Sequence, residues 1–513
     1  MFTISTFSSW ISLTWLTICF TGARFAQWLL RQNHYSSYQS IDTSSALNHI
    51  QTPLPPSPST AAPRVKDTTP HIHSLPVELL TEIFSYVVHD DSPRDSKTYT
   101  PPSQLSASEN SLVDPIFLGQ VCGRWRHVTL SMSSLWSTIF VKCAQWYHVP
   151  QLKLWLERSK NAPLSIHVVQ DETDIDSAAV EAILRLFHGQ SSRWKDVRLD
   201  LANNVTGSLP PLSPGDIQNL ESFRLQLRRW PEEQAQEFCR VLYSSPTLRS
   251  ASWEGCFKSG FPNDIPWQQL RDISLSGVSD LDELFSILEK TSEVEVLTLG
   301  SLKSLAPHYR AAPVLIPLLH TLTNKALTAT TLFKYLTLPS LKSLILPCGF
   351  RCLRKSEALG WDALRELIER SDCRLEALNI TELSVDEDIL LANLAQPHFA
   401  SIRELTLAFP VSNRTIMGLT RSGGSGDILP HLTSLTLTEC RSTDGALAEM
   451  MRSRRSPNTR SRSKIMALDV NARGYGLHKD QRAVESLTQE GMNIRWVLGN
   501  VVARDCRRRR PLP

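Results

Sequence analysis

Apolar positions follow their most regular pattern between residues 160 and 500, where short LxxLxL segments recur. Alternating apolar residues of this kind predict short strands that turn one side toward a core. Three segments also have a proline two residues before their first leucine, at Pro246, Pro339 and Pro430. The nine segments are Leu220/Phe223/Leu225, Leu248/Ala251/Trp253, Leu270/Ile273/Leu275, Val294/Leu297/Leu299, Leu341/Leu344/Leu346, Leu375/Leu378/Ile380, Ile402/Leu405/Leu407, Leu432/Leu435/Leu437 and Ile465/Leu468/Val470.

A repeated strand that cannot bury its apolar side alone is stabilised by stacking on its neighbours. The segments therefore predict an irregular leucine-rich-repeat-like solenoid over residues 160–500, within an α+β or α/β repeat fold. The alternative is a generic α/β domain with leucine-rich strands. The length of the array and the lack of a glycine-rich βαβ fingerprint favour the solenoid.

Residues 72–139 carry a helical pattern instead. Pro76 suits the first turn of a helix, and Glu78 lies near its positive end. Leu79, Leu80, Ile83, Phe84 and Val87 then form an apolar stripe. A polar loop, predicted to be exposed and mobile, follows at residues 89–113.

Asp114 and Pro115 indicate the start of a second helix, as an N-cap residue followed by a proline in the first helical position. The stripe of this helix is Leu118, Val121, Cys122 and Trp125, with spacing i, i+3, i+4, i+7. A third short helix is expected to hold Leu135, Trp136 and Ile139. Three helices this short make a marginal core, which favours a partner that completes it.

Three motif blocks stand in order here: Leu-Pro-x-Glu-Leu-Leu-x-x-Ile-Phe, Leu-x-x-Val-Cys-x-x-Trp-Arg and Leu-Trp-x-x-Ile, at 75–84, 118–126 and 135–139. This order resembles an F-box, most of all the F-box-like domains of large fungal families with divergent leucine-rich repeats. The resemblance implies a three-helix F-box over 71–140 that docks on the Skp-family adaptor of an SCF ubiquitin ligase. It places the adaptor contacts on Leu75, Pro76, Glu78, Leu79, Leu80, Ile83, Phe84, Leu118, Val121, Cys122 and Trp125.

The repeats would then bind the protein that is to be ubiquitinated. In a solenoid, the residues between the strand leucines point outward on the strand side. They form a small, mostly neutral set that predicts a surface recognised by shape. The candidate target-binding residues are Ser252, Ser274, Thr298, Ile345, Asn379, Thr406 and Thr436.

The two ends of the chain differ from the rest. Residues 1–33 are an apolar segment, and residues 34–70 read as a disordered Ser/Thr/Pro linker. A membrane anchor or signal over residues 7–30 is an alternative, although no basic residue precedes the apolar run. Residues 501–513 form a basic tail that is compatible with nuclear import. We expect a cytoplasmic or nuclear protein.

Composition, charge and the lack of known motifs argue against several classes of function. The formal net charge is +3, so the whole chain is not a polyanion-binding surface and no nucleic acid is expected. The 10 cysteines are scattered without a CxxC pair, which argues against zinc and for reduced thiols. The sequence contains no P-loop, GxSxG, HExxH or kinase signature. We expect no enzyme activity and no cofactor.

The sequence therefore predicts the substrate-recognition adaptor of an SCF ligase. Two alternatives stay open. One is a repeat scaffold that works without the ligase. The other is a membrane-tethered or secreted leucine-rich-repeat protein, which would explain the apolar N-terminus and the N-x-T sequons at Asn204, Asn379 and Asn413.

Overall fold

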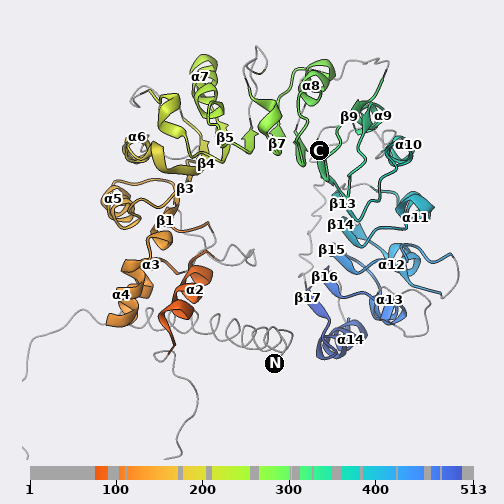
Figure 1. Cartoon of the computed structure of the whole chain (residues 1–513). Helices are drawn as coiled ribbons and strands as arrows, with labels where there is room; N and C mark the ends of the chain where they lie inside the picture. The colour runs from red at the N-terminus through yellow and green to blue at the C-terminus, as the bar shows by residue number, and fades with distance from the viewer. Residues whose placement is uncertain are drawn as a thin grey trace, which may run out of the picture. The chain divides into compact units, whose positions relative to one another are not determined.

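A computed structural model describes most of the chain between residues 75 and 498 (Figure 1). The chain divides into two compact units, Met1–Arg193 and Trp194–Pro513. The described residues are 75–89, 103–109, 113–171, 177–203, 211–254, 261, 265–300, 302, 312–325, 329–347, 360–381, 385–422, 426–455, 464–473 and 477–498. The predicted N-terminal segment, the Ser/Thr/Pro linker and the basic tail lie outside them.

The first unit combines a helical cluster with three strands. Strand β1 pairs antiparallel with β2, and β2 pairs parallel with β3. Its elements are α2 (Val77–Val88), β1 (Gln104–Ser106), α3 (Pro115–Val121), α4 (Gly123–Ser131), η2 (Ser133–Trp136), β2 (Thr138–Lys142), α5 (His148–Arg158), β3 (Leu164–Val169), α6 (Ser177–His188) and η3 (Ser191–Arg193).

Aromatic residues hold the helical cluster together. The rings of Phe84 on α2 and Trp125 on α4 pack with their centroids 4.8 Å apart. Trp136 donates its indole N–H to the carbonyl of Thr129 at 3.0 Å and packs edge-on against Trp155. These contacts are typical of buried aromatic pairs and join α2, α4, η2 and α5 into one core.

Three predictions for this region were wrong in detail. The expected second helix is two helices, because Cys122 adopts an extended conformation (φ −160°, ψ 169°) between α3 and α4. Ile139 lies in strand β2 and not in a helix. Part of the predicted polar loop forms β1, because its backbone pairs with β2 from Gln104↔Lys142 to Ser106↔Phe140. Residues 90–102 and 110–112 of that loop lie outside the described ranges.

The second unit is a large parallel sheet in which chain neighbours are almost always sheet neighbours. The sheet order is β4-β5-β6-β7-β8-β10-β12-β13-β14-β15-β16-β17. Its strands are β4 (Trp194–Leu201), β5 (Ser222–Leu227), β6 (Ser250–Trp253), β7 (Asp272–Leu275), β8 (Val296–Leu299), β10 (Thr321–Asn324), β12 (Ser343–Pro347), β13 (Ala377–Thr381), β14 (Glu404–Val411), β15 (Ser434–Cys440), β16 (Ala467–Ala472) and β17 (Asn493–Leu498).

Helices connect many of these strands, and Figure 1 shows α10–α14 side by side along one face of β13–β17. A small parallel pair, β9 (Val314–Leu315) with β11 (Leu336–Thr337), stands apart from the main sheet. The helical elements are η5 (Pro214–Ile217), α7 (Glu232–Tyr243), η6 (Trp267–Gln269), α8 (Leu281–Leu288), α9 (Ala329–Lys334), α10 (Trp361–Ser371), α11 (Glu387–Leu394), η7 (Pro397–Phe399), α12 (Asn413–Leu419), α13 (Ala446–Arg455) and α14 (His478–Gln489).

All nine LxxLxL segments meet a strand of this sheet, and all their apolar positions are buried. The position of the proline before three of these segments is explained by a turn. Pro246, Pro339 and Pro430 each occupy the second position of a turn, closed by the N–H of Leu248, Leu341 and Leu432. Proline favours that position because its φ is already fixed there. The turn thus sets where each strand begins.

The fold class is confirmed at the level of a mixed α/β protein with a large, mostly parallel sheet. Strand β10 was missed by the sequence pattern. Among the described residues, no helix is both long enough and apolar enough to cross a membrane.

Candidate functional site

Helix α2 has a wider apolar surface than the first unit covers. Leu80, Phe84 and Val88 are buried and face the rest of the cluster. Val77 and Leu79 are each 46% exposed, and Ile83 is half-buried. Because 100° separates successive residues of a helix, Leu79 and Ile83 continue the same apolar arc beyond its buried part. About half of the arc therefore faces solvent.

Four of the eleven predicted adaptor contacts are internal core residues. Leu80, Phe84, Leu118 and Trp125 are buried, with Phe84 only 1% exposed. These four side chains leave little area for a partner to contact, because the break at Cys122 turns Trp125 inward onto Phe84. The other seven are half-buried or exposed: Leu75, Pro76, Glu78, Leu79, Ile83, Val121 and Cys122.

The sequence reasoning missed several exposed apolar residues on the same helices. Val77 and Tyr86 on α2, Phe117 on α3 and Leu130 on α4 are all exposed. The helical period could have indicated Tyr86, which lies seven residues after Leu79 and so on the same side of α2. We call Leu79, Ile83 and Tyr86 the α2 outer face. Val77, the first residue of α2, lies on the other side of the helix, near Phe84 and Val88.

Among the described acids of the first unit, Asp114 has the pKa that departs most from its ordinary value. It precedes α3 as predicted, but its side chain makes no cap hydrogen bond to that helix. Burial raises the pKa of Asp114 to about 7, and a hydrogen bond from the backbone of Ala107 opposes this shift. Asp114 therefore ties the segment containing β1 to the start of α3, at an electrostatic cost.

The seven candidate target-binding residues lie in one continuous row across the second unit. Strand pairing aligns Ser252 with Ser274, then Thr298, and later Asn379 with Thr406 and Thr436. The row also contains Thr323 of β10, which the sequence analysis missed and which stands between Thr298 and Ile345. Ser252 is buried, whereas the other six are half-buried.

Charged residues end this row on both sides of its neutral middle. Arg224 precedes Ser252 in register, and Arg198 precedes Arg224. At the other end, Asp469 and Arg495 follow Thr436 and approach each other at 3.9 Å. The face away from the helices thus carries small polar side chains between two charged ends. Such a surface can recognise an extended partner by shape and by charge at its margins.

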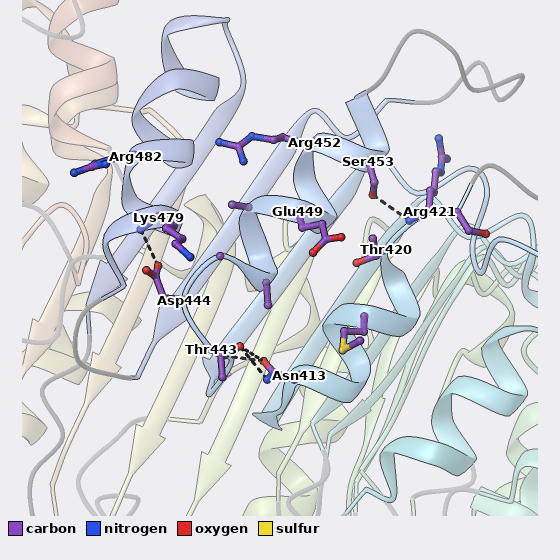
Figure 2. Close-up of a pocket in the computed structure, with 15 residues that line it drawn as sticks. Asn413, Thr420, Arg421, Thr443, Asp444, Glu449, Arg452, Ser453, Lys479 and Arg482 are labelled. Atoms are coloured by element: carbon purple, nitrogen blue, oxygen red, sulfur yellow. Dashed lines mark hydrogen bonds between the residues drawn. The ribbon is translucent and has the colours of Figure 1, made fainter.

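A groove of about 1110 Å³ lies on the helical side of the second unit, among α12, α13 and α14 (Figure 2). Asn413 accepts the backbone N–H of Thr443 at 2.7 Å and donates to its hydroxyl at 3.0 Å. Asp444 accepts the N–H of Lys479 at 2.7 Å and so caps α14. Gly445 follows Asp444 and leads into α13, with a φ of +98° that favours glycine. These bonds fix the walls of the groove.

The groove is rich in cations. Arg421, Arg452, Lys479 and Arg482 line it, together with the acids Asp444 and Glu449. Only the basic tail of residues 501–513 had been named from the sequence, and none of these four cations lies in that tail. Arg452 and Lys479 are far apart in sequence, so only the packing of α13 on α14 could reveal the cluster.

The part of the chain that the structure describes contains no cluster of side chains suited to hold a metal ion. No group of three or more His, Cys, Asp or Glu side chains is arranged there to hold an ion. Cys122, Cys143, Cys239, Cys373 and Cys440 are free thiols.

Comparisons with known proteins give a distant structural likeness and no family. No protein-family model matches the chain, and no curated protein matches it. One similar solved structure is a Bacteroides fragilis protein from the Northeast Structural Genomics Consortium, with a TM-score of 0.31 and 12% sequence identity. The match covers 49% of this chain and 66% of that protein, just under two thirds of its length.

Proposed function

We propose that this chain is the substrate receptor of an SCF-type ubiquitin ligase, with an F-box at 71–140 and a leucine-rich-repeat-like solenoid after it. The observation that carries the proposal is the α2 outer face. An apolar arc that is only half covered by its own unit is the surface expected for an obligate docking helix. The three motif blocks that resemble an F-box lie on this cluster.

The energy for docking would come from a few side chains. Burying one exposed leucine contributes about 1.5–3 kcal/mol. Leu79 is 46% exposed and Tyr86 is 47% exposed, so both side chains of the outer face have area left to bury. Leu80, Phe84, Leu118 and Trp125 would then act indirectly, by holding α2 against α4. Interfaces of this kind concentrate their energy in a small number of such anchors.

We propose that the target binds the row from Ser252 to Thr436. Parallel strands present these residues at a regular spacing, and their short side chains let a partner approach the sheet closely. The charged ends would orient the partner along the row.

Affinity capture tests the assembly. Full-length tagged protein is expressed under proteasome inhibition, and captured proteins are identified by mass spectrometry. Wild type should recover a Skp-family adaptor and a cullin, and Leu79→Asp should lose both. Leu154→Asp is the matched control, because Leu154 is an exposed leucine of α5 in the same unit. Equal recovery by all three chains would contradict the proposal.

A second candidate has an observation in its favour. The burial of Leu80, Phe84, Leu118 and Trp125 also suits a helical cap of a ligase-independent scaffold. In that case wild type would capture a repeat-binding partner without adaptor or cullin.

A further inference from the structure

Three cationic side chains of the groove make no hydrogen bond or ion pair within the described chain, although Arg452 interacts electrostatically with Asp480. Arg452 on α13 and Lys479 and Arg482 on α14 are exposed. None of their side chains makes a hydrogen bond or ion pair with another described residue. Figure 2 shows them on one side of the groove, away from the carboxylate of Glu449. Their charge is therefore available to a ligand.

The fourth cation has a structural role. Arg421 is buried, and its guanidinium donates to the carbonyl of Pro430. Its backbone N–H donates to the hydroxyl oxygen of Ser453 at 3.0 Å. It holds the floor of the groove between α12 and α13. The three free cations and the rigid floor together make a preformed site, which lowers the ordering cost of binding.

Opposite the cations the groove has one exposed apolar side chain, which stands among the polar residues Asn413 and Thr420. Met417 of α12 lines it and is 69% exposed. A methionine side chain is flexible and polarisable, and it adapts to varied apolar partners. The groove thus offers positive charge along one wall and an adaptable apolar contact at the other.

We propose that this groove binds an acidic protein segment that carries aliphatic side chains among its carboxylates. Its acids would pair with Arg452, Lys479 and Arg482, and an aliphatic side chain would pack on Met417. The site lies on the helical side of the second unit, whereas the row from Ser252 to Thr436 lies on the opposite face of the sheet. It would be a third protein-binding surface, beside the α2 outer face and the row from Ser252 to Thr436, and it does not depend on adaptor docking.

Nucleic acid and membranes fit this groove less well. A nucleic acid carries a negative charge on every phosphate and would meet the carboxylates of Glu449 and Asp444, whereas a peptide can place a neutral side chain beside them. The lining contains no aromatic side chain on which a base could stack. A lipid surface is flat and anionic, and would meet the same carboxylates.

Fluorescence anisotropy with the full chain tests the proposal. The probe is a fluorescein-labelled peptide of Glu-Glu-Leu repeats, and the control probe has Gln-Gln-Leu repeats. Wild type should bind the acidic probe, and added salt should weaken that binding. Arg452→Glu with Arg482→Glu should weaken it about tenfold or more. Lys342→Glu with Arg374→Glu, at exposed positions outside the groove, makes the same change in net charge and should have little effect.

A variant that is expected to bind more tightly separates an effect on binding from an effect on folding. Glu449→Lys removes the carboxylate opposite the cations and should strengthen binding of the acidic probe. The proposal is overturned if the acidic probe does not bind, or if both double variants weaken it equally. It is also overturned if duplex DNA or phosphatidylserine vesicles bind through Arg452 and Arg482 while the peptide does not.

Discussion

Leu79 and Phe84 belong to one helix but have opposite environments. Phe84 packs on Trp125, and removing its ring should cost about 3–5 kcal/mol of local stability. Leu79→Ala should cost much less, because nearly half of that side chain already faces solvent. Hydrogen–deuterium exchange over α2 and α4 of the full chain measures both effects. Similar loss of protection in the two variants would show that Leu79 is also core.

Asp114 makes the stability of the first unit depend on pH. Its pKa is about 7 in the folded chain against an ordinary value of 3.8, so the folded state holds the proton more tightly. The stabilising contribution is therefore complete below about 3.8 and is lost as pH rises through 7. Asp114→Asn should flatten this pH dependence and raise stability at neutral pH.

Thermal unfolding at a series of pH values checks this expectation. The control is Glu157→Gln, which changes an exposed carboxyl of α5. An unchanged pH profile in Asp114→Asn would exclude Asp114 as the titrating group.

At single positions, the sequence predicted the apolar arc of α2 but not which half is buried. Leu79 and Leu80 are adjacent and chemically identical, so local pattern cannot separate them. Their difference comes from the position of Trp125, which packs on α2 from a distant part of the chain. Burial of this kind is set by long-range packing.

At the scale of elements, neighbouring repeats are joined by acids that accept backbone N–H groups. Glu387 of α11 accepts the N–H of Ser412 at 3.2 Å and that of Thr415 at 3.0 Å, at the start of α12. A carboxylate there also favours the positive end of the helix. Glu387 thus fixes the position of one helix relative to the next.

Removing this carboxylate should loosen the array locally. Glu387→Ala is expected to lower stability by about 1.5–3 kcal/mol, as for hydrogen bonds to a charged group. Glu404→Ala, at an exposed acid without a side-chain bond in the described chain, is the matched control. Urea unfolding of both variants provides the measurement. Equal midpoints would show that Glu387 does not support α12.

Two strands were missed for different reasons. Strand β4 was missed although Trp194, Val197 and Leu199 complete the apolar pattern and are buried, whereas β10 was missed because its pattern is broken. Strand β10 carries Leu319 and Leu322 at the usual positions, but Asn324 takes the third and is buried. Because Asn324 is polar, this segment does not match the pattern of three apolar residues by which the other strands were predicted. The break between α3 and α4 at Cys122 was not predicted, because the apolar residues on its two sides keep the spacing of a single helix.

At the scale of the whole molecule, different surfaces would bind different partners. The α2 outer face would bind the adaptor, the row from Ser252 to Thr436 would bind the target, and the groove of α12–α14 would bind an acidic segment. The sequence predicted the first two surfaces through motif and period. It could not predict the third, because Arg452, Lys479 and Arg482 converge only after folding.

The most direct test of the central claim is a calorimetric titration of the purified full chain with a purified Skp-family adaptor. Wild type should bind, and Leu79→Asp should raise the Kd by about thirtyfold or more, as expected for a central anchor. Leu154→Asp should change it by less than about twofold. An adaptor that fails to bind wild type, or that binds Leu79→Asp equally well, would contradict the account.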